Sequence, residues 1–345
     1  MTGVDTGTGR ALLRDLVETP SVSGEEDDCA SRLAEFFESR DRAAWRDEAG
    51  NLRAPGDDAL LLTSHLDTVP GDIPVEERDG ALWGRGSVDA KGSLAAMAVA
   101  AVETGASFVG VVQEETDSAG ARFLATHRSP PGAVINGEPS GWDAITLGYR
   151  GLLEGTYVAT SRSGHSSRPE PNAIQDAVAW WSEIESALGG DELQKPFERV
   201  TPKPIDIEGG TSEDGLSVEA RIRVQFRIPP GRTVEDVREV VEERLSAGTV
   251  TWDEPVPPVM ESPRTPVASA LRRAIRAQGG EPAHLRKTGT SDMNVFADTW
   301  DVPMATYGPG DASLDHTPEE HLALEEFDRA TRVLTEAADS LLAAQ

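Results

Sequence analysis

Two strand-like apolar runs separated by an alanine-rich segment constrain the fold more than any other feature of this sequence. The runs are ALLLTSHLD at 59–67 and SFVGVVQEE at 107–115, and SLAAMAVAAVE at 93–103 between them predicts a closely packed helix. A third apolar run, GAVINGE, follows at 132–138. Short apolar runs that alternate with helices are typical of an α/β fold, with a mostly parallel sheet covered by helices.

The pattern changes after about residue 149 and changes back about a hundred residues later. The stretch SVEARIRVQFRI at 217–228 alternates between apolar and polar residues, which indicates an antiparallel sheet with one buried face. Helical patterns at 172–188 and 233–247 accompany it. The α/β character then returns, so we predict an interrupted first domain and an α+β insert. The predicted boundaries are 1–148 and 260–345 for the first domain, and 149–259 for the second.

The charge balance excludes some partners. The 345 residues contain 60 acidic and 32 basic side chains, a net charge of −28, which argues against nucleic acid and anionic membranes as partners. The acidic residues are scattered along the whole chain rather than gathered in one tail. Scattered charge favours a solvated acidic coat suited to high salt, and an acidic face for a basic partner is the alternative.

The sequence also indicates the cellular location of the protein. It contains no run of eighteen apolar residues, and its first residues, MTGVDTGTGRALLRDLVE, lack the basic and apolar regions of a signal peptide. Cys29 is the only cysteine, so no internal disulfide can form. We therefore expect a cytoplasmic protein.

Acidic residues lie at the end of each apolar run, joined in the first run by a histidine. They are His65 and Asp67 in the first, Glu114 and Glu115 in the second, and Glu138 in the third. Ligands of parallel sheets gather at the carboxyl ends of the strands, and buried carboxylates are costly unless cations compensate them. Asp67 can accept a hydrogen bond from the His65 imidazole and so fix its tautomer. A metal site at this edge is the prediction, although a strand-end histidine beside a turn aspartate would explain the first pair equally well.

Two glycine-rich loops complete the set of candidate ligands. Asp89 lies in WGRGSVDAKG before the alanine-rich helix, where capping that helix is the alternative role. His316 lies in YGPGDASLDHTPEEHL. Two imidazoles and three carboxylates suit a pair of zinc ions with one carboxylate bridging them. The predicted ligands are His65, Asp89, Glu115, Glu138 and His316. Three further histidines, His127, His284 and His321, are expected on the surface or in helices, and Cys29 in the core.

The motifs HLDTVP, GRGSVDAKG, QEETDSAG, NGEPSG and the late histidine resemble those of a dinuclear-zinc metallopeptidase family. This family includes aminoacylases, glutamate carboxypeptidase, acetylornithine deacetylase and succinyl-diaminopimelate desuccinylase, and the resemblance covers nearly the whole chain. It implies a hydrolase of linear amides with two zinc ions per subunit, or cobalt as the alternative. His65 and Glu138 would hold one ion and Glu115 and His316 the other. Asp89 would bridge the two, Glu114 would be the general base, and Asp67 would orient a ligand.

The second domain is similar to the lid and dimerisation domain of that family. SGHSSRP at 163–169 aligns with a lid histidine, so His165 would reach the active site of the partner subunit in a homodimer and help to hold the oxyanion. QFRIPP at 225–230 aligns with a strand that carries a substrate-binding arginine, here Arg227. The family often has an asparagine about thirteen residues earlier, where this chain has SEDGLSVEA. Asp214 or its neighbours occupy that place, which puts the usual oxyanion or carboxylate contact in doubt.

A narrower resemblance concerns the substrate. LGYRG at 147–151, TGTSDMN at 288–294 and YGPGDASLDHTPEEHL at 307–322 resemble the hydrolases that release lysine or ornithine from the amino-group carrier protein LysW in lysine and arginine biosynthesis. The resemblance implies LysW as substrate and partner, with Thr290 and Ser291 among the substrate-binding residues. A small-molecule N-acyl amino acid deacylase and a metal-free binding homologue are the alternatives. LysW is expected to be acidic, so a local basic patch would help it to dock, with Arg150, Arg162, Arg168 and Arg227 as candidates.

Overall fold

The computed structural model describes residues 6–165, 167, 169–190 and 193–344. The chain divides into two compact units, which we call the first and the second unit. The first unit comprises Met1–Leu147, Glu261–Leu285 and Ser291–Gln345, and the second comprises Gly148–Met260 and Arg286–Thr290. The short segment Arg286–Thr290 was expected in the first domain and instead belongs to the second unit.

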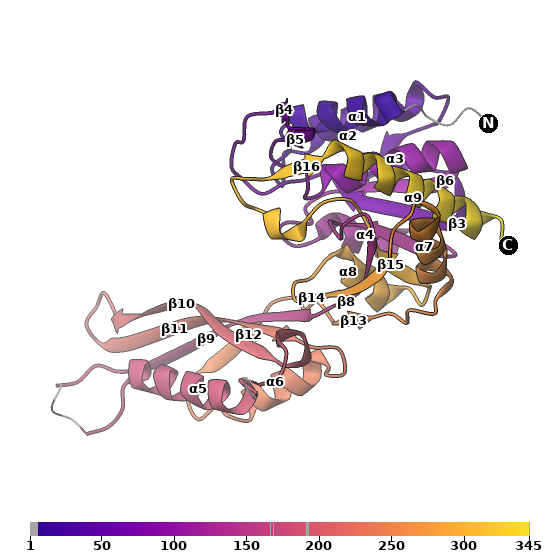
Figure 1. Ribbon diagram of the computed structural model, residues 1–345. Helices are drawn as coiled ribbons and strands as arrows, with labels where there is room; N and C mark the ends of the chain where they lie inside the picture. The colour runs from indigo at the N-terminus through magenta and orange to yellow at the C-terminus, as the bar shows by residue number, and fades with distance from the viewer. Residues whose placement is uncertain (1–5, 166, 168, 191–192, 345) are drawn as a thin grey trace. The chain divides into compact units, whose positions relative to one another are not determined.

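The larger sheet has nine strands, in the path β1-β2-β6-β3-β7-β15-β8-β13 with β14 also paired to β8. Figure 1 labels six of these strands, β3, β6, β8, β13, β14 and β15. The bounds are β1 Trp45–Arg46, β2 Leu52–Ala54, β3 Asp57–His65, β6 Ala106–Val111, β7 Val134–Gly137, β8 Ala144–Tyr149, β13 Val259–Met260, β14 Ala283–Lys287 and β15 Met304–Thr306. The pairs β3–β6, β3–β7 and β7–β15 are parallel, whereas β1, β2, β8 and β13 pair antiparallel. The predicted α/β fold is therefore confirmed, with its parallel strands at the centre of a mixed sheet.

The register brings the carboxyl ends of three central strands to one edge. His65, the last residue of β3, pairs with Val111, the last residue of β6, and Ser64 pairs with Gly137, the last residue of β7. The strand predicted at 107–115 is four residues too long, because β6 ends at Val111. Whatever follows these strands must therefore meet at one side of the sheet.

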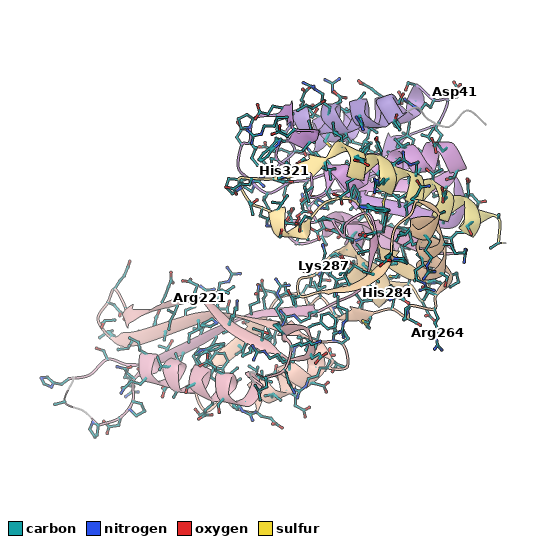
Figure 2. All side chains as sticks on the ribbon, viewed as in Figure 1. Asp41, Arg221, Arg264, His284, Lys287 and His321 are labelled. Atoms are coloured by element: carbon teal, nitrogen blue, oxygen red, sulfur yellow. The ribbon has the colours of Figure 1, made fainter. Side chains whose placement is uncertain are left out.

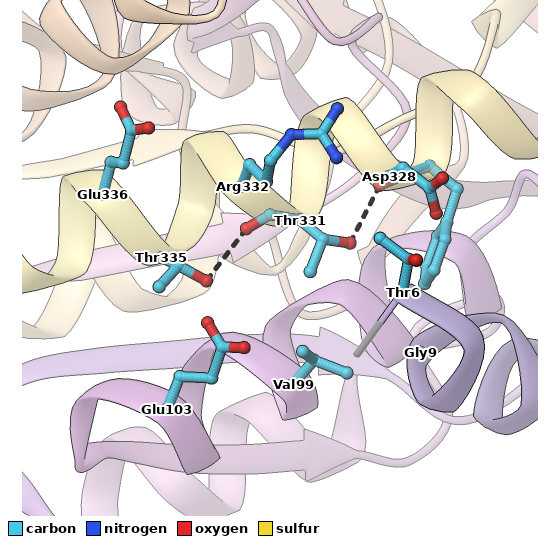
Figure 3. Close-up of a pocket in the computed structure, with 10 residues that line it drawn as sticks. Thr6, Gly9, Val99, Glu103, Asp328, Thr331, Arg332, Thr335 and Glu336 are labelled. Atoms are coloured by element: carbon cyan, nitrogen blue, oxygen red, sulfur yellow. Dashed lines mark hydrogen bonds between the residues drawn. The ribbon is translucent and has the colours of Figure 1, made fainter. Parts of the chain in front are cut away.

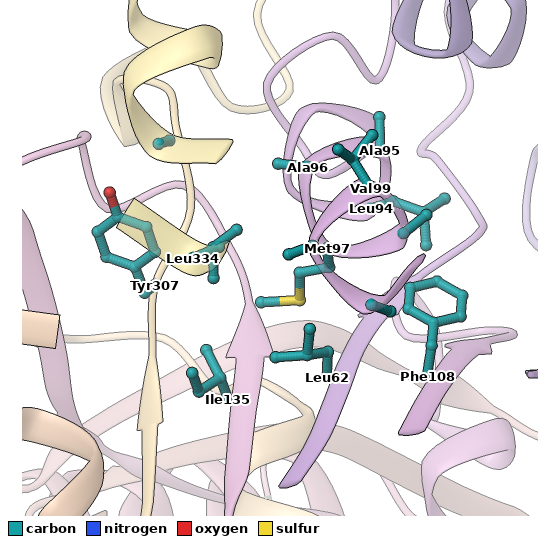
Figure 4. Packing of buried hydrophobic residues seen from close by; sticks show 14 of the residues in the cluster. Leu62, Leu94, Ala95, Ala96, Met97, Val99, Phe108, Ile135, Tyr307 and Leu334 are labelled. Carbon is teal, nitrogen blue, oxygen red and sulfur yellow. The ribbon is translucent and has the colours of Figure 1, made fainter. Parts of the chain in front are cut away.

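Helices cover this sheet. They are α1 Thr6–Glu18, α2 Asp27–Glu38, α3 Lys91–Thr104, α4 Ala119–His127, α7 Pro266–Ala277, α8 Asp292–Thr299 and α9 Leu324–Leu342. The alanine-rich α3 packs against α1 and α9 and is buried from Lys91 to Ala101, as its small side chains allow. Figure 4 shows Met97 of α3 above Leu62 of β3 and Ile135 of β7, in the middle of the apolar core.

A second, three-stranded sheet has the order β16-β5-β4 and was not predicted from the sequence. Its strands are β4 Glu76–Arg78, β5 Ala81–Trp83 and β16 His321–Ala323. Trp83 pairs with His321 and Leu82 with Leu322, so the chain just before Asp89 is held next to the chain just after His316. The short helix η2, Ala312–Leu314, lies in the loop that leads to His316.

The second unit contains an antiparallel sheet in the order β10-β11-β9-β12. Its elements are β9 Gly151–Arg162, α5 Ala173–Leu188, η1 Pro196–Glu198, β10 Thr201–Thr211, β11 Ser217–Ile228, α6 Val234–Glu242 and β12 Thr249–Trp252. Helices α5 and α6 cover one face (Figure 1). Alternate residues of β11 from Ala220 to Ile228 are buried beneath them, which confirms the predicted one-sided strand.

None of the helices within the described residues combines the length and the apolar character that crossing a bilayer requires.

Candidate metal centre

His65 presents one imidazole nitrogen to the protein and the other to a group of carboxylates. Its Nδ1 lies 2.9 Å from the carbonyl oxygen of Asp67 and 3.4 Å from Asp67 Oδ1, and its Nε2 lies 3.2 Å from Asp89 Oδ1. Burial lowers the pKa of His65, but hydrogen bonds with Asp67 and Asp89 and the charges of Glu138 and Glu114 raise the pKa well above its ordinary value. An acceptor at Nδ1 fixes the tautomer that leaves Nε2 available to a cation.

Asp67 organises the turn after β6 as well as the imidazole. Its carboxylate accepts hydrogen bonds from Ser23 Oγ at 2.7 Å and from the backbone N–H groups of Glu114 and Glu115, both at 3.1 Å. The two preceding amides, of Val112 and Gln113, donate to the side chains of Asn51 and Glu26, so all four amides after β6 bind side chains instead of a neighbouring strand, and β6 is shorter than predicted. Although burial raises the pKa of Asp67, His65 and these hydrogen bonds lower it overall. The sequence predicted that the Asp67 carboxylate would accept from the imidazole; the carboxylate lies 3.4 Å from Nδ1, and the carbonyl oxygen of Asp67 lies closer, at 2.9 Å. The two amide contacts were not predicted.

Asp89 lies between the two histidines. Its Oδ1 is 3.2 Å from His65 Nε2, and its Oδ2 is 3.2 Å from His316 Nε2. The N-cap residue of α3 is Ala90, so Asp89 is not the N-cap residue that was considered as its alternative role. A carboxylate whose two oxygens face two different imidazoles has the geometry of a bridging ligand.

His316 is the only predicted ligand outside the strand ends and the loop before α3. It has a left-handed backbone with φ of 62°, and its Nε2 lies 3.1 Å from the Glu115 carboxylate. Hydrogen bonds with Asp89 and then Glu115 raise the pKa of His316 to about 10. Half of the side chain is exposed, so this face of the centre is open to solvent.

The potential ligand atoms form two overlapping groups, whose members lie within 4.8 Å of one another. One consists of His65, Asp89 and Glu115, and the other of His65, Glu114 and Glu138. Burial and the charge of Glu138 raise the pKa of Glu114 well above its ordinary value. So many carboxylates around two imidazoles carry more negative charge than a protein interior accommodates alone, and cations would offset it. The donor set therefore fits a pair of metal ions of borderline softness.

Asp292 is a buried acid that was not among the residues predicted from the sequence. It is the first residue of α8 and only 1% exposed, and its Oδ1 has no hydrogen-bond partner among the described residues. Burial raises its pKa to about 7, while the charge of His65 lowers it. The available signal was its place in TGTSDMN, from which only Thr290 and Ser291 were predicted to act.

The predicted lid and substrate residues lie apart from these ligands in the chain, and their roles stay predictions. His165 follows β9 in the second unit, where its Nδ1 is 2.8 Å from Ser167 Oγ. In the same unit, Arg227 Nη1 donates to Thr290 Oγ1 at 3.4 Å. Ser291 belongs to the first unit, where its Oγ caps α8 by accepting from Met293 N. Asp214 holds the β10–β11 turn by accepting from Ser212 Oγ and Leu216 N.

Arg150 cannot belong to the predicted basic surface patch, because its side chain is buried. Arg150 is only 6% exposed and donates to the carbonyl oxygens of Thr288 and Pro196, so it is a buried residue of the second unit. Burial, followed by the charges of Arg227 and Arg199, lowers its pKa to about 10. Arg162 is exposed, and Arg168 lies outside the described residues.

The residues assigned no chemistry lie where we expected them. Cys29 is fully buried, and His127 ends α4 on the surface. His284 is exposed on β14 (Figure 2). His321 is partly exposed and stacks on Trp83 with the ring centroids 4.1 Å apart.

A separate pocket of about 240 Å³ lies between α1, α3 and α9 (Figure 3). Several of its polar side chains are already engaged, since Thr331 and Thr335 bond to the backbone of α9, and Asp328 binds Arg10. The residues that α3 contributes, Val99 and Glu103, lie roughly three helical turns or more beyond Asp89, so the pocket is not part of the metal centre.

The fold and this centre agree with a comparison against protein families. Residues 61–340 match the model of peptidase family M20/M25/M40, and the chain belongs to that family. It is a metal-dependent hydrolase of amide bonds.

Two relatives align with almost the entire chain. The LysW-lysine hydrolase of Deinococcus radiodurans is 40% identical, covering 98% of this chain and 98% of the relative. The putative LysW-lysine/LysW-ornithine hydrolase of Thermococcus kodakarensis is 36% identical, covering 97% of this chain and 92% of the relative.

Solved structures share the fold at much lower identity. The aminopeptidase PepT of Bacillus cereus has a TM-score of 0.81 at 19% identity, covering 98% of this chain and 99% of the other. A dinuclear metal-binding peptidase of the M20 family from Bacillus subtilis has a TM-score of 0.69 at 17% identity, covering 99% of this chain and 100% of the other.

Proposed function

We propose that this enzyme is a zinc-dependent hydrolase that releases lysine, ornithine or both from the carrier protein LysW. The scissile amide would join the γ-carboxyl of the carrier's C-terminal glutamate to the α-amino group of the product. The observation that carries the proposal is the 40% identity to a LysW-lysine hydrolase over 98% of both chains. The geometry of the first unit supports it, because His65, Asp89, Glu114, Glu115 and Glu138 form two overlapping groups of potential ligands, and His316 Nε2 lies 3.2 Å from Asp89 and 3.1 Å from Glu115.

Two cations would share Asp89. His65 and Glu138 would complete one site, since Glu138 Oε1 lies 4.0 Å from the His65 Nε2 that also faces Asp89. Glu115 and His316 would complete the other, since His316 Nε2 lies 3.2 Å from Asp89 Oδ2 and 3.1 Å from the Glu115 carboxylate. Zinc suits this mixture of imidazole and carboxylate ligands, and cobalt is the alternative metal.

Glu114 would move the proton. Bound zinc ions would polarise the amide carbonyl and lower the pKa of a water molecule. The Glu114 carboxylate, held beside Glu138 and His65, would take a proton from the attacking water and then donate it to the departing amine. Asp67 fixes the backbone amide of Glu114 and so the starting point of that side chain. The products would be the free carboxylate of the carrier and the free amino acid.

A homodimer would complete the site through the second unit. Strand β10 is an edge strand that is exposed from Lys203 to Thr211, and Ile207 is 61% exposed. Ile174 and Val178 on α5 add to this exposed apolar surface. An unpaired edge with exposed branched side chains is suited to pairing with a second copy. In such a dimer His165 of one chain would help to hold the oxyanion in the other, and Arg227 would bind a substrate carboxylate.

A small-molecule N-acyl amino acid deacylase would use the same ligands, so only substrates separate the two functions. The purified enzyme should be incubated with LysW-lysine, LysW-ornithine and acetylornithine, and the released amino acid measured. We expect release from at least one carrier-linked substrate at a much higher kcat/KM than from acetylornithine. Release from acetylornithine alone would contradict the carrier-protein proposal.

The acidic surface favours work at high salt. On α2 and α6 the residues Asp27, Asp28, Glu235 and Asp236 are exposed, while the apolar faces of both helices are buried. At about 1 M salt the Debye length falls to ~3 Å, so long-range repulsion between two acidic proteins would fade. We therefore expect LysW turnover to rise with salt up to the molar range, and activity that falls steadily with added salt would contradict this.

We also propose a cytoplasmic location, because a lone buried cysteine such as Cys29 is typical of a reducing compartment. Fractionation of the source cells, with detection by an antibody, would test this location.

A further inference from the structure

Glu320 is a buried carboxylate that lies between the two loops carrying Asp89 and His316. Its side chain is fully buried, at 0% exposure. Oε1 accepts hydrogen bonds from the backbone N–H groups of Val88 at 3.0 Å and of Asp89 at 3.1 Å. The carboxylate therefore binds directly to the backbone of the candidate bridging ligand, although it lies more than two hundred residues away in the chain.

The second oxygen of Glu320 is bound by Arg85. Arg85 Nη1 donates to Oε2 at 2.7 Å and also to the carbonyl oxygen of Thr317 at 3.3 Å, and its Nε donates to the carbonyl oxygen of Gly71 at 3.2 Å. The Glu320 carbonyl oxygen accepts in turn from Gly84 N at 3.4 Å. The side chain of each residue thus binds the backbone of the other's loop: Arg85 binds Thr317 in the loop at 316–320, and Glu320 binds Val88 and Asp89 in the loop at 84–89.

The loop that carries His316 needs such support. A left-handed backbone at a residue other than glycine is unfavourable and persists only where the surroundings hold it. His316 and Asp89 approach within 3.2 Å, and Glu115 lies 3.1 Å from the same imidazole nitrogen. A metal site tolerates little change in these separations between ligand atoms, because the distance from the metal to each ligand atom varies by only about 0.2 Å.

We propose that Glu320 is a positioning residue that sets the separation of Asp89 and His316, and so the affinity of the cation site formed by these two residues and Glu115. Arg85 is its partner, because the guanidinium satisfies the oxygen that the two amides leave. Glu320 touches neither the substrate nor a cation in this role. The inference rests on the proposed two-cation site but not on the identity of the substrate.

Glutamine cannot replace Glu320 without a conflict. The amides of Val88 and Asp89 and the guanidinium of Arg85 are all donors, and the two carboxylate oxygens accept from different ones. The glutamine amide has only one oxygen, so its NH₂ would face either Arg85 or the two amides. A buried donor facing a donor would shift one of the two loops. Replacing a group that orients a ligand typically lowers metal affinity about 10–100-fold.

The test compares Glu320→Gln with Glu319→Gln, which makes the same change at the exposed neighbouring position. Each purified holoenzyme is dialysed against a graded series of a zinc-buffering chelator, and the zinc retained per chain is measured. We expect Glu320→Gln to lose one of two zinc ions at a free zinc concentration at least about tenfold higher than the parent, and Glu319→Gln to match the parent. The melting temperature of each chelator-stripped protein serves as the control for global stability.

The outcomes separate the two proposals. Fewer than two zinc ions in the parent would contradict the two-cation site itself. Two zinc ions retained equally by the parent and Glu320→Gln would overturn only the role of Glu320. Equal weakening of both zinc ions, together with a lower melting temperature of the stripped protein, would also overturn it in favour of a general structural role.

Arg85→Met keeps the inference testable if Glu320→Gln does not fold. Methionine retains a long apolar stem but removes the donor to Oε2, whereas the two amide hydrogen bonds to Oε1 remain. We expect the same zinc ion to be lost at a free zinc concentration about three- to tenfold higher than in the parent, a smaller effect than for Glu320→Gln. Unchanged zinc retention in this variant would overturn the inference.

Discussion

Some acidic side chains of the first unit are fully enclosed, whereas acidic side chains of the second unit lie on its surface. In the first unit Asp67 and Glu320 are fully buried, and each accepts several hydrogen bonds. In the second unit Glu208, Glu235 and Asp236 lie exposed on β10 and α6. The difference follows from the sheets. The parallel strands of the first unit are buried on both faces, so a side chain such as Asp67 just beyond the end of β3 is enclosed, and Glu320 is enclosed between two loops. The antiparallel sheet of the second unit is covered by helices on one face.

This contrast shows that the number of acidic residues says little about chemistry in this protein. The net charge of −28 comes mainly from residues of the exposed kind, and only their position at strand ends and in two loops distinguishes the candidate ligands. We expect the enclosed acids to act in hydrolysis and metal binding, and the exposed acids of the second unit to take no part in either.

The largest expected effect concerns Glu114. Glu114→Gln should lower kcat for carrier-linked lysine by roughly 10²–10⁴-fold, because a general base of this kind contributes that much to the rate. Zinc content should stay at the parental value, since Glu114 is not among the proposed ligands. Steady-state kinetics and metal analysis on the same preparation would check both. Glu77→Gln, at an exposed residue of β4, is the matched control and should be fully active. Parental activity of Glu114→Gln would remove Glu114 from the role.

A core substitution in the second unit should act on stability instead. Phe226 is fully buried beneath the helices of this unit, so Phe226→Ala should lower the free energy of unfolding by about 3–5 kcal/mol. Denaturant titration would measure the loss, and zinc per folded chain should be unchanged. Val158→Ala, at a side chain 41% exposed, should change the free energy by no more than about 0.5 kcal/mol. A loss of zinc from folded Phe226→Ala would show that the second unit also supports metal binding.

The pH dependence of metal binding should report on His316. Its pKa is raised to about 10 in the metal-free protein, so below that pH a cation must displace a proton from the imidazole. Apparent zinc affinity should therefore rise with pH by about tenfold per unit for each proton displaced, between about pH 6 and 9. The sign for folding is opposite: protonated His316 stabilises the metal-free protein at low pH, and this contribution is lost as pH rises through about 10. Competition titrations with a chelator would measure the slope, and a pH-independent affinity would contradict the assignment of His316 as a ligand.

The smallest effect on stability is expected at the edge strand. Ile207→Lys places a charge on exposed β10 and should change the free energy of unfolding by no more than about 0.5 kcal/mol. It should nevertheless shift a dimer toward monomer and lower activity, if His165 acts across the dimer. Sedimentation and activity measured over a range of protein concentrations would show this. Lys203→Ala, at the start of the same exposed stretch, is the control, and a parental dimer in Ile207→Lys would place the interface elsewhere.

Much of the first unit could be predicted because its signals are local. The apolar runs and the alanine-rich helix are confirmed as β3, β6, β7 and α3, since burial on both faces requires continuous apolar sequence. The turn after β6 could not be predicted, because its four amides are bound by side chains that are distant in the chain, those of Asn51, Glu26 and Asp67. The pairing of β5 with β16 also could not, since three-residue strands carry no period and their partners lie more than two hundred residues apart.

By itself, the sequence determined the fold class, the family motifs and a set of residue types able to hold metal ions. These depend on apolar periodicity and on side-chain chemistry, which are properties of short segments. Only the tertiary structure decided that the two oxygens of Asp89 face different histidines, and that the buried Glu320 holds the loop of one ligand against the loop of another. Separations of about 3 Å between residues hundreds of positions apart are set by packing and hydrogen bonding of the whole unit, which no local pattern contains.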